Sequence, residues 1–300
     1  MRLPDLYFTP SPNTLRLTRR SFLTTSLCAA CIVRAGDSLP EETLRIGVDV
    51  RFPPYSFYGD NRRIIGLDPA LAREACRRIG AKPYFIPVAW DQKDEYLDSG
   101  RIDCLWSCFS MNGRETRYQW IPYLYSRHVV VVPQTSVIQR VADLAGCAVA
   151  VQAGTLTEEF FLNHPKAPSV EDLVVLPSTG EAFLSLRNAY AQAAAGHEAV
   201  LTHLMQEVPG SYRLLEEPLL EAKIGVAFAL NCRRPQLFAR LKRELARMAE
   251  EGETSRLAAG YDLDASKVVL MPHEESPARN EEKRRNARRR LQAEATSGAN

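Results

Sequence analysis

Short apolar segments alternate with amphipathic segments along the chain from Leu44 to about residue 251. A short run of Val, Ile, Leu or aromatic residues is typical of a buried strand, whereas apolar residues three or four positions apart are typical of a helix. The pattern predicts strands over 44–50, 83–90, 102–106, 128–133, 147–154, 173–177, 198–202 and 222–230. It predicts helices over 68–80, 91–100, 139–144, 156–164, 181–195 and 235–251.

The helix over 68–80 has the clearest boundaries. Asp68 is placed to cap its first turn, Pro69 stands at the first helical position, and Gly80 ends it. Asp91 is expected to cap the next helix in the same way. Because a helix connects each strand to the next, the strands are expected to run mostly parallel.

The pattern of strand and helix starts again after residue 133. Two successive α/β units predict two lobes that face each other across a cleft. In open α/β sheets, ligands bind beyond the carboxyl ends of the strands, so we searched these ends for chemically useful side chains.

The residues at the predicted strand ends form a chemically consistent set. Arg114 offers a planar fork of N–H donors that suits a carboxylate, and Thr155 opens a helix whose free amides favour an anion. Any one of these residues alone would more often be a packing or ion-pairing residue, but their ordered occurrence predicts a ligand site. The candidates are Asp49, Phe52, Trp90, Ser107, Cys108, Ser110, Arg114, Thr155 and His203.

Composition excludes some functions. The chain has 300 residues, 45% of them hydrophobic, which is typical of a globular protein. Its net charge of +2 is too small for a nucleic-acid partner to be expected. Residues 274–300 are charged and poor in large apolar residues, so they are expected to form a disordered tail. Two of the seven cysteines lie in the expected export signal, and the other five are an odd number without a Cys-x-x-Cys pair, so neither a metal site nor a full disulfide set is indicated.

Residues 1–36 have the pattern of an export signal. Arg19 and Arg20 precede an apolar run, 22–33, that is too short to span a bilayer. This order is similar to a twin-arginine signal, which a receptor reads as an address. The sequence before Cys31 weakly resembles a lipoprotein cleavage box, so a membrane anchor at Cys31 stays open. An amphipathic N-terminus on a cytoplasmic protein is the alternative.

Several segments at matching spacing carry a family resemblance: "LRIGVDVRFPPYSFYG", "VAWDQKDEYLDSGRIDCLWSCFSMNGRETR", "PYLYSRHVVVVP" and "VAVQAGTLTEE". Together they resemble the extracellular solute-binding proteins of polar amino-acid ABC importers, the type II periplasmic binding proteins of family 3. The resemblance covers about 44–270 and implies two lobes hinged by two crossing strands. It implies that lobe 1 comprises 44–130 and 230–270, and lobe 2 comprises 133–225.

The resemblance also implies roles for the residues of the first strand ends. Phe52 and Trp90 correspond to an aromatic pair that flanks the ligand side chain, and Asp49 to a residue that meets a polar or basic side chain. Ser107 and Cys108 are expected to offer backbone groups.

The expected carboxylate contacts come next along the chain. Ser110 offers its amide or hydroxyl, Arg114 binds the ligand carboxylate, and Thr155 is the matching donor from lobe 2. Relatives commonly place this arginine one residue later, where Glu115 stands here, so Arg117 is the alternative.

His203 departs from the resemblance. The family usually ends the corresponding strand with an aspartate that pairs with the ligand's α-ammonium, and the simplest alignment places His203 there. A neutral imidazole accepts one hydrogen bond but supplies no counter-charge. Either another acid such as Asp49 compensates, or the ligand is a carboxylate without a free α-amine.

Three functions were compared. The leading one is a solute-binding protein that delivers a small carboxylated solute, an amino acid or similar, to an inner-membrane ABC permease; it requires no cofactor, metal or catalytic residue, and a monomer suffices. A periplasmic lyase on the same scaffold, such as a cyclohexadienyl dehydratase, is the runner-up, and needs an acid in the cleft. A sensor domain is third, and would require a membrane helix and a signalling domain.

Overall fold

The computed structural model describes residues 42–271. The expected export signal with Cys31 and the expected tail over 274–300 lie outside the described residues. The described part is an α/β protein with one nine-stranded sheet, ordered β5-β1-β6-β12-β7-β10-β8-β9 with β11 paired to β7, and one three-stranded sheet, β2-β3-β4. Between residues 42 and 271, no helix combines the length and apolar character that crossing a membrane requires.

Lobe 1 is built on three parallel strands, β1 (Glu42–Val48), β5 (Ala81–Pro87) and β6 (Cys104–Ser110). Its remaining elements are β2 (Arg51–Phe52), β3 (Ser56–Tyr58), β4 (Ile64–Ile65), α1 (Leu67–Arg78), η1 (Trp90–Gln92), α2 (Lys93–Asp98), α6 (Pro235–Glu250), α7 (Glu253–Ala259) and η3 (Ala265–Lys267).

Strand β6 illustrates why both faces of this sheet are covered. All seven of its residues are buried. Because successive side chains of a strand point to opposite faces, Cys104 and Trp106 pack with α1 and α6, while Leu105 and Phe109 pack on the α2 side. A continuous apolar run of this kind is what a sheet between two helical layers requires.

Lobe 2 is built on β8 (Ala148–Gln152), β9 (Asp172–Leu176) and β10 (Ala193–His197), which run parallel. Its other elements are η2 (Val141–Leu144), α3 (Leu156–Asn163), α4 (Thr179–Arg187), α5 (Glu198–Glu207) and β11 (Tyr212–Leu214). Phe160 and Phe161 of α3 fill one face of the sheet, and Phe183 of α4 fills the other.

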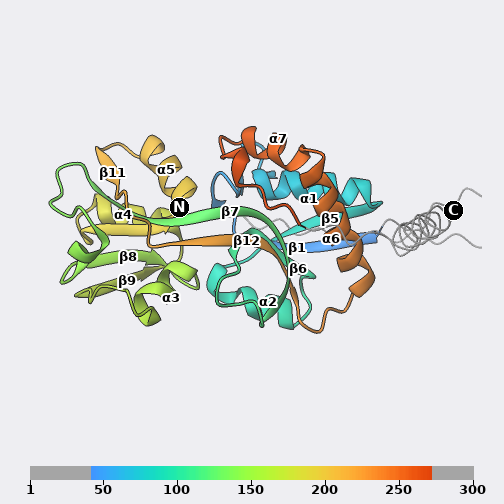
Figure 1. Cartoon of the computed structure of the whole chain (residues 1–300), viewed down its shortest axis with the longest axis horizontal. Coiled ribbons are helices and arrows are strands. Elements are labelled where there is room, and N and C mark those ends of the chain that lie inside the picture. The colour runs from blue at the N-terminus through green and yellow to red at the C-terminus, as the bar shows by residue number, and fades with distance from the viewer. Residues whose placement is uncertain (1–41, 272–300) are drawn as a thin grey trace, which may run out of the picture. The chain divides into compact units, whose positions relative to one another are not determined.

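Two long antiparallel strands, β7 (Tyr118–Pro133) and β12 (Leu220–Ala229), run from one lobe into the other (Figure 1). Ile121 and Leu124 of β7 belong to the core of lobe 1, whereas Val130 and Val132 belong to a core of lobe 2. The strand expected over 128–133 is therefore only the second half of β7. The crossing strands contribute to both cores, so core membership alone does not divide their residues between the lobes. The expected lobe boundaries therefore stay a prediction.

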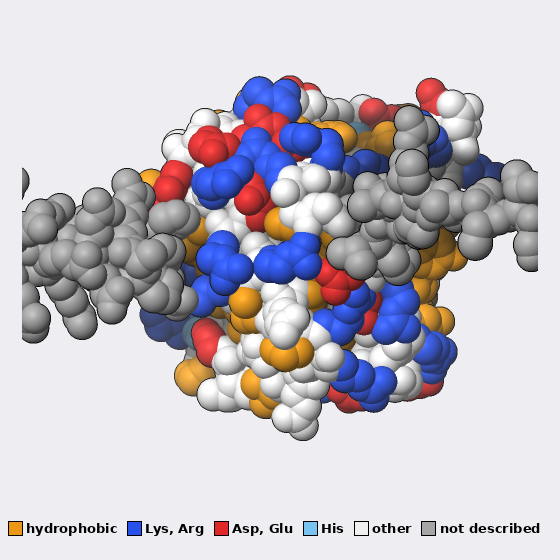
Figure 2. Space-filling model, turned by 90° about the vertical axis from the view of Figure 1, so that its right-hand side faces the viewer, with side chains coloured by type: hydrophobic (Ala, Val, Ile, Leu, Met, Phe, Trp, Pro, Cys, Tyr) orange, Lys and Arg blue, Asp and Glu red, His pale blue; other side chains and the backbone are white. Residues whose placement is uncertain are grey.

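The charged side chains at the outer end of lobe 1 are of both signs. Figure 2 shows Lys and Arg interspersed with Asp and Glu on this face. Arg78 of α1 contacts Glu74, Glu244 and Glu251. Because these positive and negative charges are paired, they do not form a surface patch of one sign.

Two expected elements of lobe 2 are wrong. The helix expected over 181–195 ends at Arg187, and the strand expected over 198–202 lies within α5. Residues 193–197 form β10 instead, between β7 and β8. Alanine has the highest helix propensity, but here three fully buried alanines fit between two neighbouring strands, and this tertiary packing overrides the local preference.

The expected helix caps are also wrong. Gly66 precedes α1, and Asp91 lies inside the short η1 turn rather than before a helix. Asp68 is a fully buried residue of the first turn of α1, where its carboxylate accepts hydrogen bonds from the Tyr123 hydroxyl at 2.6 Å and the Cys108 amide at 2.7 Å. Its role is to connect α1 to the end of β6.

We expect Asp68 to contribute a loss of stability as pH rises from 4 to 7, opposite in sign to the contribution of the buried neutral histidines His128 and His197. Burial raises the pKa of Asp68 to about 7, against the opposing effect of its two hydrogen bonds. An unfolded aspartate has a pKa of about 3.9, so the folded state holds the proton more tightly, and up to about 4 kcal/mol of unfolding free energy is lost as pH rises through this window.

Urea unfolding at pH 4.5 and pH 7.5 measures this effect. Relative to the wild type, Asp68→Asn should gain unfolding free energy at pH 7.5 compared with pH 4.5, because it lacks the loss that Asp68 causes, whereas Asp98→Asn, at an exposed position, should keep the wild-type dependence. If the unfolding free energy of Asp68→Asn depends on pH as that of the wild type does, Asp68 does not contribute to the dependence.

Candidate functional site

Eight of the nine predicted site residues line one small cavity between the lobes. They are Asp49, Phe52, Trp90, Ser107, Cys108, Ser110, Arg114 and Thr155. Phe109, Gln152, Leu156 and His197 complete the lining. The cavity volume open to a water-sized guest is about 20 Å³, which is room for about one water molecule. A solute of amino-acid size therefore fits only if side chains or lobes move apart.

Asp49 connects the two lobes at one end of the cavity. It follows β1, and its Oδ2 accepts a hydrogen bond of 2.7 Å from Nε2 of Gln152, the last residue of β8. Its Oδ1 accepts one of 3.0 Å from the Arg51 amide. Burial raises the pKa of Asp49, and these hydrogen bonds oppose the shift. Gln152 is in turn oriented by Thr179, whose hydroxyl donates to Gln152 Oε1 at 2.8 Å.

Arg114 is a buried cation that also contacts both lobes. Its guanidinium lies 5.2 Å from the centre of the Phe109 ring, and its Nη1 donates to the Ser110 carbonyl at 3.2 Å. Its Nη2 donates to Oε1 of Glu159 in α3 at 2.5 Å. The side chain of Arg114 is 6% exposed and that of Glu159 45% exposed, so the acid of this pair is the partner accessible to solvent.

The start of α3 is the second expected donor of hydrogen bonds to an anion. Thr155 caps the helix by accepting a bond of 3.3 Å from the Glu158 amide, and its hydroxyl donates to the Gln152 carbonyl at 2.7 Å. The Gly154 amide donates to Oε2 of Glu158 at 2.7 Å. Arg114 and the Gly154 amide, which precedes α3, thus both contact glutamates of α3.

His197, the last residue of β10, lies in the cavity and was missed by the sequence analysis. Its Nδ1 is 2.8 Å from the Ser126 hydroxyl and 3.6 Å from the Cys108 sulfur, and its Nε2 is 3.4 Å from the Ser110 hydroxyl. Its ring packs edge-on against Phe52 at 5.5 Å. Burial, and next the charge of Arg114, lower the pKa of His197 to about 3, so the imidazole is neutral.

His128 of β7 lies directly opposite His197 in the sheet register, with the two ring centres 4.0 Å apart. Its Nε2 is 3.1 Å from the Ser110 hydroxyl, and its Nδ1 is 2.7 Å from the Thr157 hydroxyl of α3. Burial, and next the neighbouring His197, lower the pKa of His128 far below its usual value. The two histidines therefore form an uncharged, hydrogen-bonded group that touches lobe 1, a crossing strand and lobe 2.

Cys108 is held in an uncommon backbone conformation. Its φ is 49°, which is strained for any residue with a side chain, and the hydrogen bond from its amide to Asp68 secures it. Burial, followed by the nearby Asp68, raises the pKa of the thiol well above its ordinary value. The thiol is therefore protonated and is not an activated nucleophile, despite its contact with His197.

His203 is not in this cavity, which corrects its predicted position at a strand end. It lies within α5 and lines a separate pocket with Arg127, Glu198 and Lys267. The strand that should carry the ammonium-binding position is β10, and its last residue is His197. The sequence signal that could have identified β10 was the short apolar run "AAAG" before His197, which a charged residue follows.

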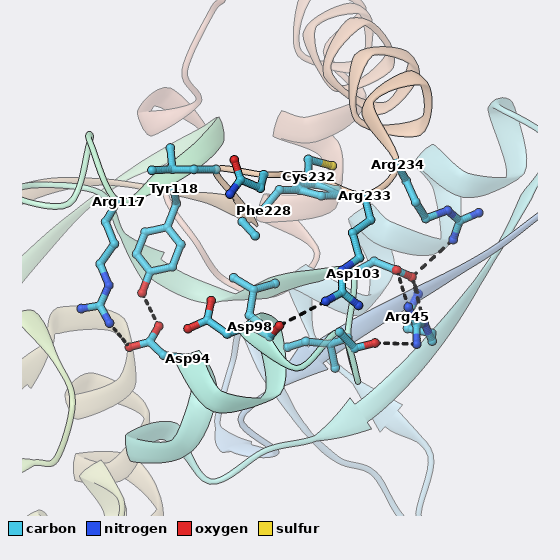
Figure 3. A pocket seen from close by; sticks show the side chains of 16 residues that line it. Arg45, Asp94, Asp98, Asp103, Arg117, Tyr118, Phe228, Cys232, Arg233 and Arg234 are labelled. Carbon is cyan, nitrogen blue, oxygen red and sulfur yellow. Dashed lines mark hydrogen bonds and ion pairs between the residues drawn. The ribbon is translucent and has the colours of Figure 1, made fainter.

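Another pocket, in lobe 1, contains none of the predicted site residues (Figure 3). Its charged side chains are largely paired: Arg45 and Arg234 contact Asp103, and Arg117 contacts Asp94. The cavity between the lobes is the better candidate because it collects polar groups from the ends of several strands, among them a buried guanidinium and a buried carboxylate.

Comparisons with known proteins agree with the observed fold. The chain is 28% identical over 238 residues to the histidine-binding periplasmic protein of Salmonella typhimurium, which covers 76% of this chain and 90% of that protein. The crystal structure of Tv2483 bound to L-arginine superposes with a TM-score of 0.68 and 26% identity, over 76% of this chain and 93% of that one.

A third similarity concerns the fold alone. The ancestral amino acid-binding protein AncCDT-1, a precursor of cyclohexadienyl dehydratase, has a TM-score of 0.65 and 24% identity, over 73% of this chain and 95% of that one.

The profile of bacterial extracellular solute-binding proteins, family 3, matches residues 44–263. The chain therefore belongs to the bacterial extracellular solute-binding proteins of family 3.

Proposed function

We propose that the protein binds a small carboxylated solute between its lobes and delivers it to an ABC permease in the inner membrane. The observation that carries this proposal is the convergence of Arg114 and Asp49 from lobe 1 with Thr155 and His197 from lobe 2 on one cavity. Arg114 offers the solute carboxylate a buried, bidentate donor, and the start of α3 adds free amides. Phe52 and Trp90 supply apolar contact area.

The proposal extends to location and partners. An extracytoplasmic protein, exported by residues 1–36 and either released or anchored through Cys31, would meet the permease as a monomer. Closure of the lobes around the solute distinguishes the loaded protein from the empty one, because a permease that contacts both lobes binds one conformer better.

A binding protein is favoured over a lyase. A lyase of the cyclohexadienyl dehydratase kind needs an acid aimed at the substrate. Asp49 is the only carboxyl group among the residues that line the cavity, and Gln152 and the Arg51 amide already occupy it. The similarity to AncCDT-1 extends to the fold, and that protein is itself described as amino acid-binding.

A thermal-shift screen of the purified chain against the common amino acids, 2-oxo acids and dicarboxylates tests the proposal. At least one of these carboxylates should raise the unfolding midpoint, because a ligand that binds only the folded state stabilises it. Product analysis of the same mixtures separates binding from turnover. A screen without any shift, or turnover of the bound compound, would contradict a carrier of small carboxylates.

Arg114→Ala should weaken binding of the solute found in that screen by about 30-fold or more, because truncating one partner of a buried charge pair costs about 2 to 5 kcal/mol. Isothermal titration measures the change. Arg117→Ala is the matched control: this arginine is 61% exposed and contacts Asp94, so its loss should leave affinity within about threefold. If Arg117→Ala weakens binding and Arg114→Ala does not, then Arg117 is the residue that binds the solute carboxylate.

Glu159→Gln should strengthen binding of the same solute by a few fold. The Glu159 carboxylate competes with the solute for Arg114, and its removal frees the guanidinium. The gain is limited because the pair is half exposed and therefore weak, worth about 0 to 1 kcal/mol. Titration at low and high salt should show the difference between the variants shrinking as salt screens the pair. Weaker binding by Glu159→Gln would mean that the acid assists the solute instead.

A further inference from the structure

We propose that the solute is a carboxylate with an uncharged group, such as a hydroxyl or oxo group, or simply hydrogen, where an amino acid carries its α-ammonium. This inference rests on the proposed function, since it assumes that Arg114 binds the solute carboxylate. It narrows the ligand to 2-hydroxy, 2-oxo and unsubstituted carboxylic acids.

The charges around the cavity are few. Among its lining residues only Asp49 and Arg114 carry a charge, because His197 and Cys108 are both neutral. Arg114 is matched by the solute carboxylate. Asp49 is therefore the only lining group that can offset a positive charge on the solute.

Asp49 belongs to a different part of the cavity from Arg114. Asp49 contacts Gln152 through its carboxylate and the Ser107 hydroxyl through its amide, whereas the guanidinium of Arg114 contacts the Ser110 carbonyl and Glu159. In an α-amino acid the ammonium is on the carbon bonded to the carboxylate, so an acid that pairs with it must lie beside the group that binds the carboxylate. Apart from Glu159, the polar groups on this side are those of Ser110, whose carbonyl accepts from Arg114, and the two neutral histidines that contact the Ser110 hydroxyl.

The environment of His197 indicates whether a positive charge is favourable beside Arg114. Its imidazole stays neutral because it is buried and faces the Arg114 guanidinium. The same desolvation and the same repulsion would act on a solute ammonium next to it. A neutral imidazole and a serine hydroxyl each donate and accept hydrogen bonds, which suits a hydroxyl or oxo group that carries no charge.

Glu159 does not supply the missing acid. It contacts Arg114 from α3, but it is not among the residues that line the cavity, and 45% of its side chain is exposed. A half-exposed carboxylate already paired with the guanidinium offers a solute ammonium only a weak, salt-screened interaction. Asp49 could meet a polar or cationic group at the far end of the solute only by exchanging one of its hydrogen bonds, to Gln152 or to the Arg51 amide.

The experiment compares matched sets of compounds that differ only at the 2-position. L-Arginine, L-histidine, L-glutamine and L-phenylalanine are each titrated into the purified chain beside their 2-hydroxy acid and their counterpart with hydrogen in place of the amine. For any set that binds, we expect the amine-free members to bind at least about tenfold more tightly than the amino acid.

Two histidine variants separate the local cause from general effects. His197→Asp places an acid beside Arg114 and should shift the preference toward the amino acid by about tenfold or more. His203→Asp makes the same change outside the cavity and should leave the preference unchanged. The wild-type comparison stands even if His197→Asp does not fold, because it needs no variant.

The outcomes distinguish the two proposals. Amino acids that bind as tightly as their amine-free counterparts overturn this inference and leave the proposed function intact. A His203→Asp protein that changes preference as much as His197→Asp also overturns it. If no compound of any set binds and the broader carboxylate screen is also negative, the proposed function fails and this inference fails with it.

Discussion

The antiparallel pairing of β7 with β12 is the constraint on which the rest of the molecule depends. Each strand contributes side chains to the cores of both lobes, so the sheet is continuous while the helices that cover it form two groups. The ends of β1 and β6 therefore face the ends of β8 and β10 across a short distance. This places an acid, a guanidinium, a histidine and a helix start from distant parts of the chain around one cavity.

Sequence patterns predicted most of this architecture because each signal was local. The apolar run of β6 and the start of α3 at Leu156 follow from side-chain burial and capping that act over a few residues. The search of the predicted strand ends identified eight residues that line one cavity in the structure.

The failures came from interactions that are distant in sequence. The three alanines of β10 favour a helix locally, and only the neighbouring strands β7 and β8 make them a strand. That single error moved the expected ammonium position from His197 to His203. Asp68 was expected to cap a helix because its spacing to Pro69 is typical of a cap, yet Tyr123 and Cys108, more than 35 residues away, determine its role.

The ion pair between Arg114 and Glu159 makes access to the guanidinium depend on the surrounding medium. It joins a buried cation of lobe 1 to an acid of lobe 2 that solvent reaches. Dissolved ions screen such a pair within about 10 Å at 0.1 M. Because the pair is worth about 0 to 1 kcal/mol, the ionic composition of the medium changes by up to a few fold how often an arriving solute finds the guanidinium free.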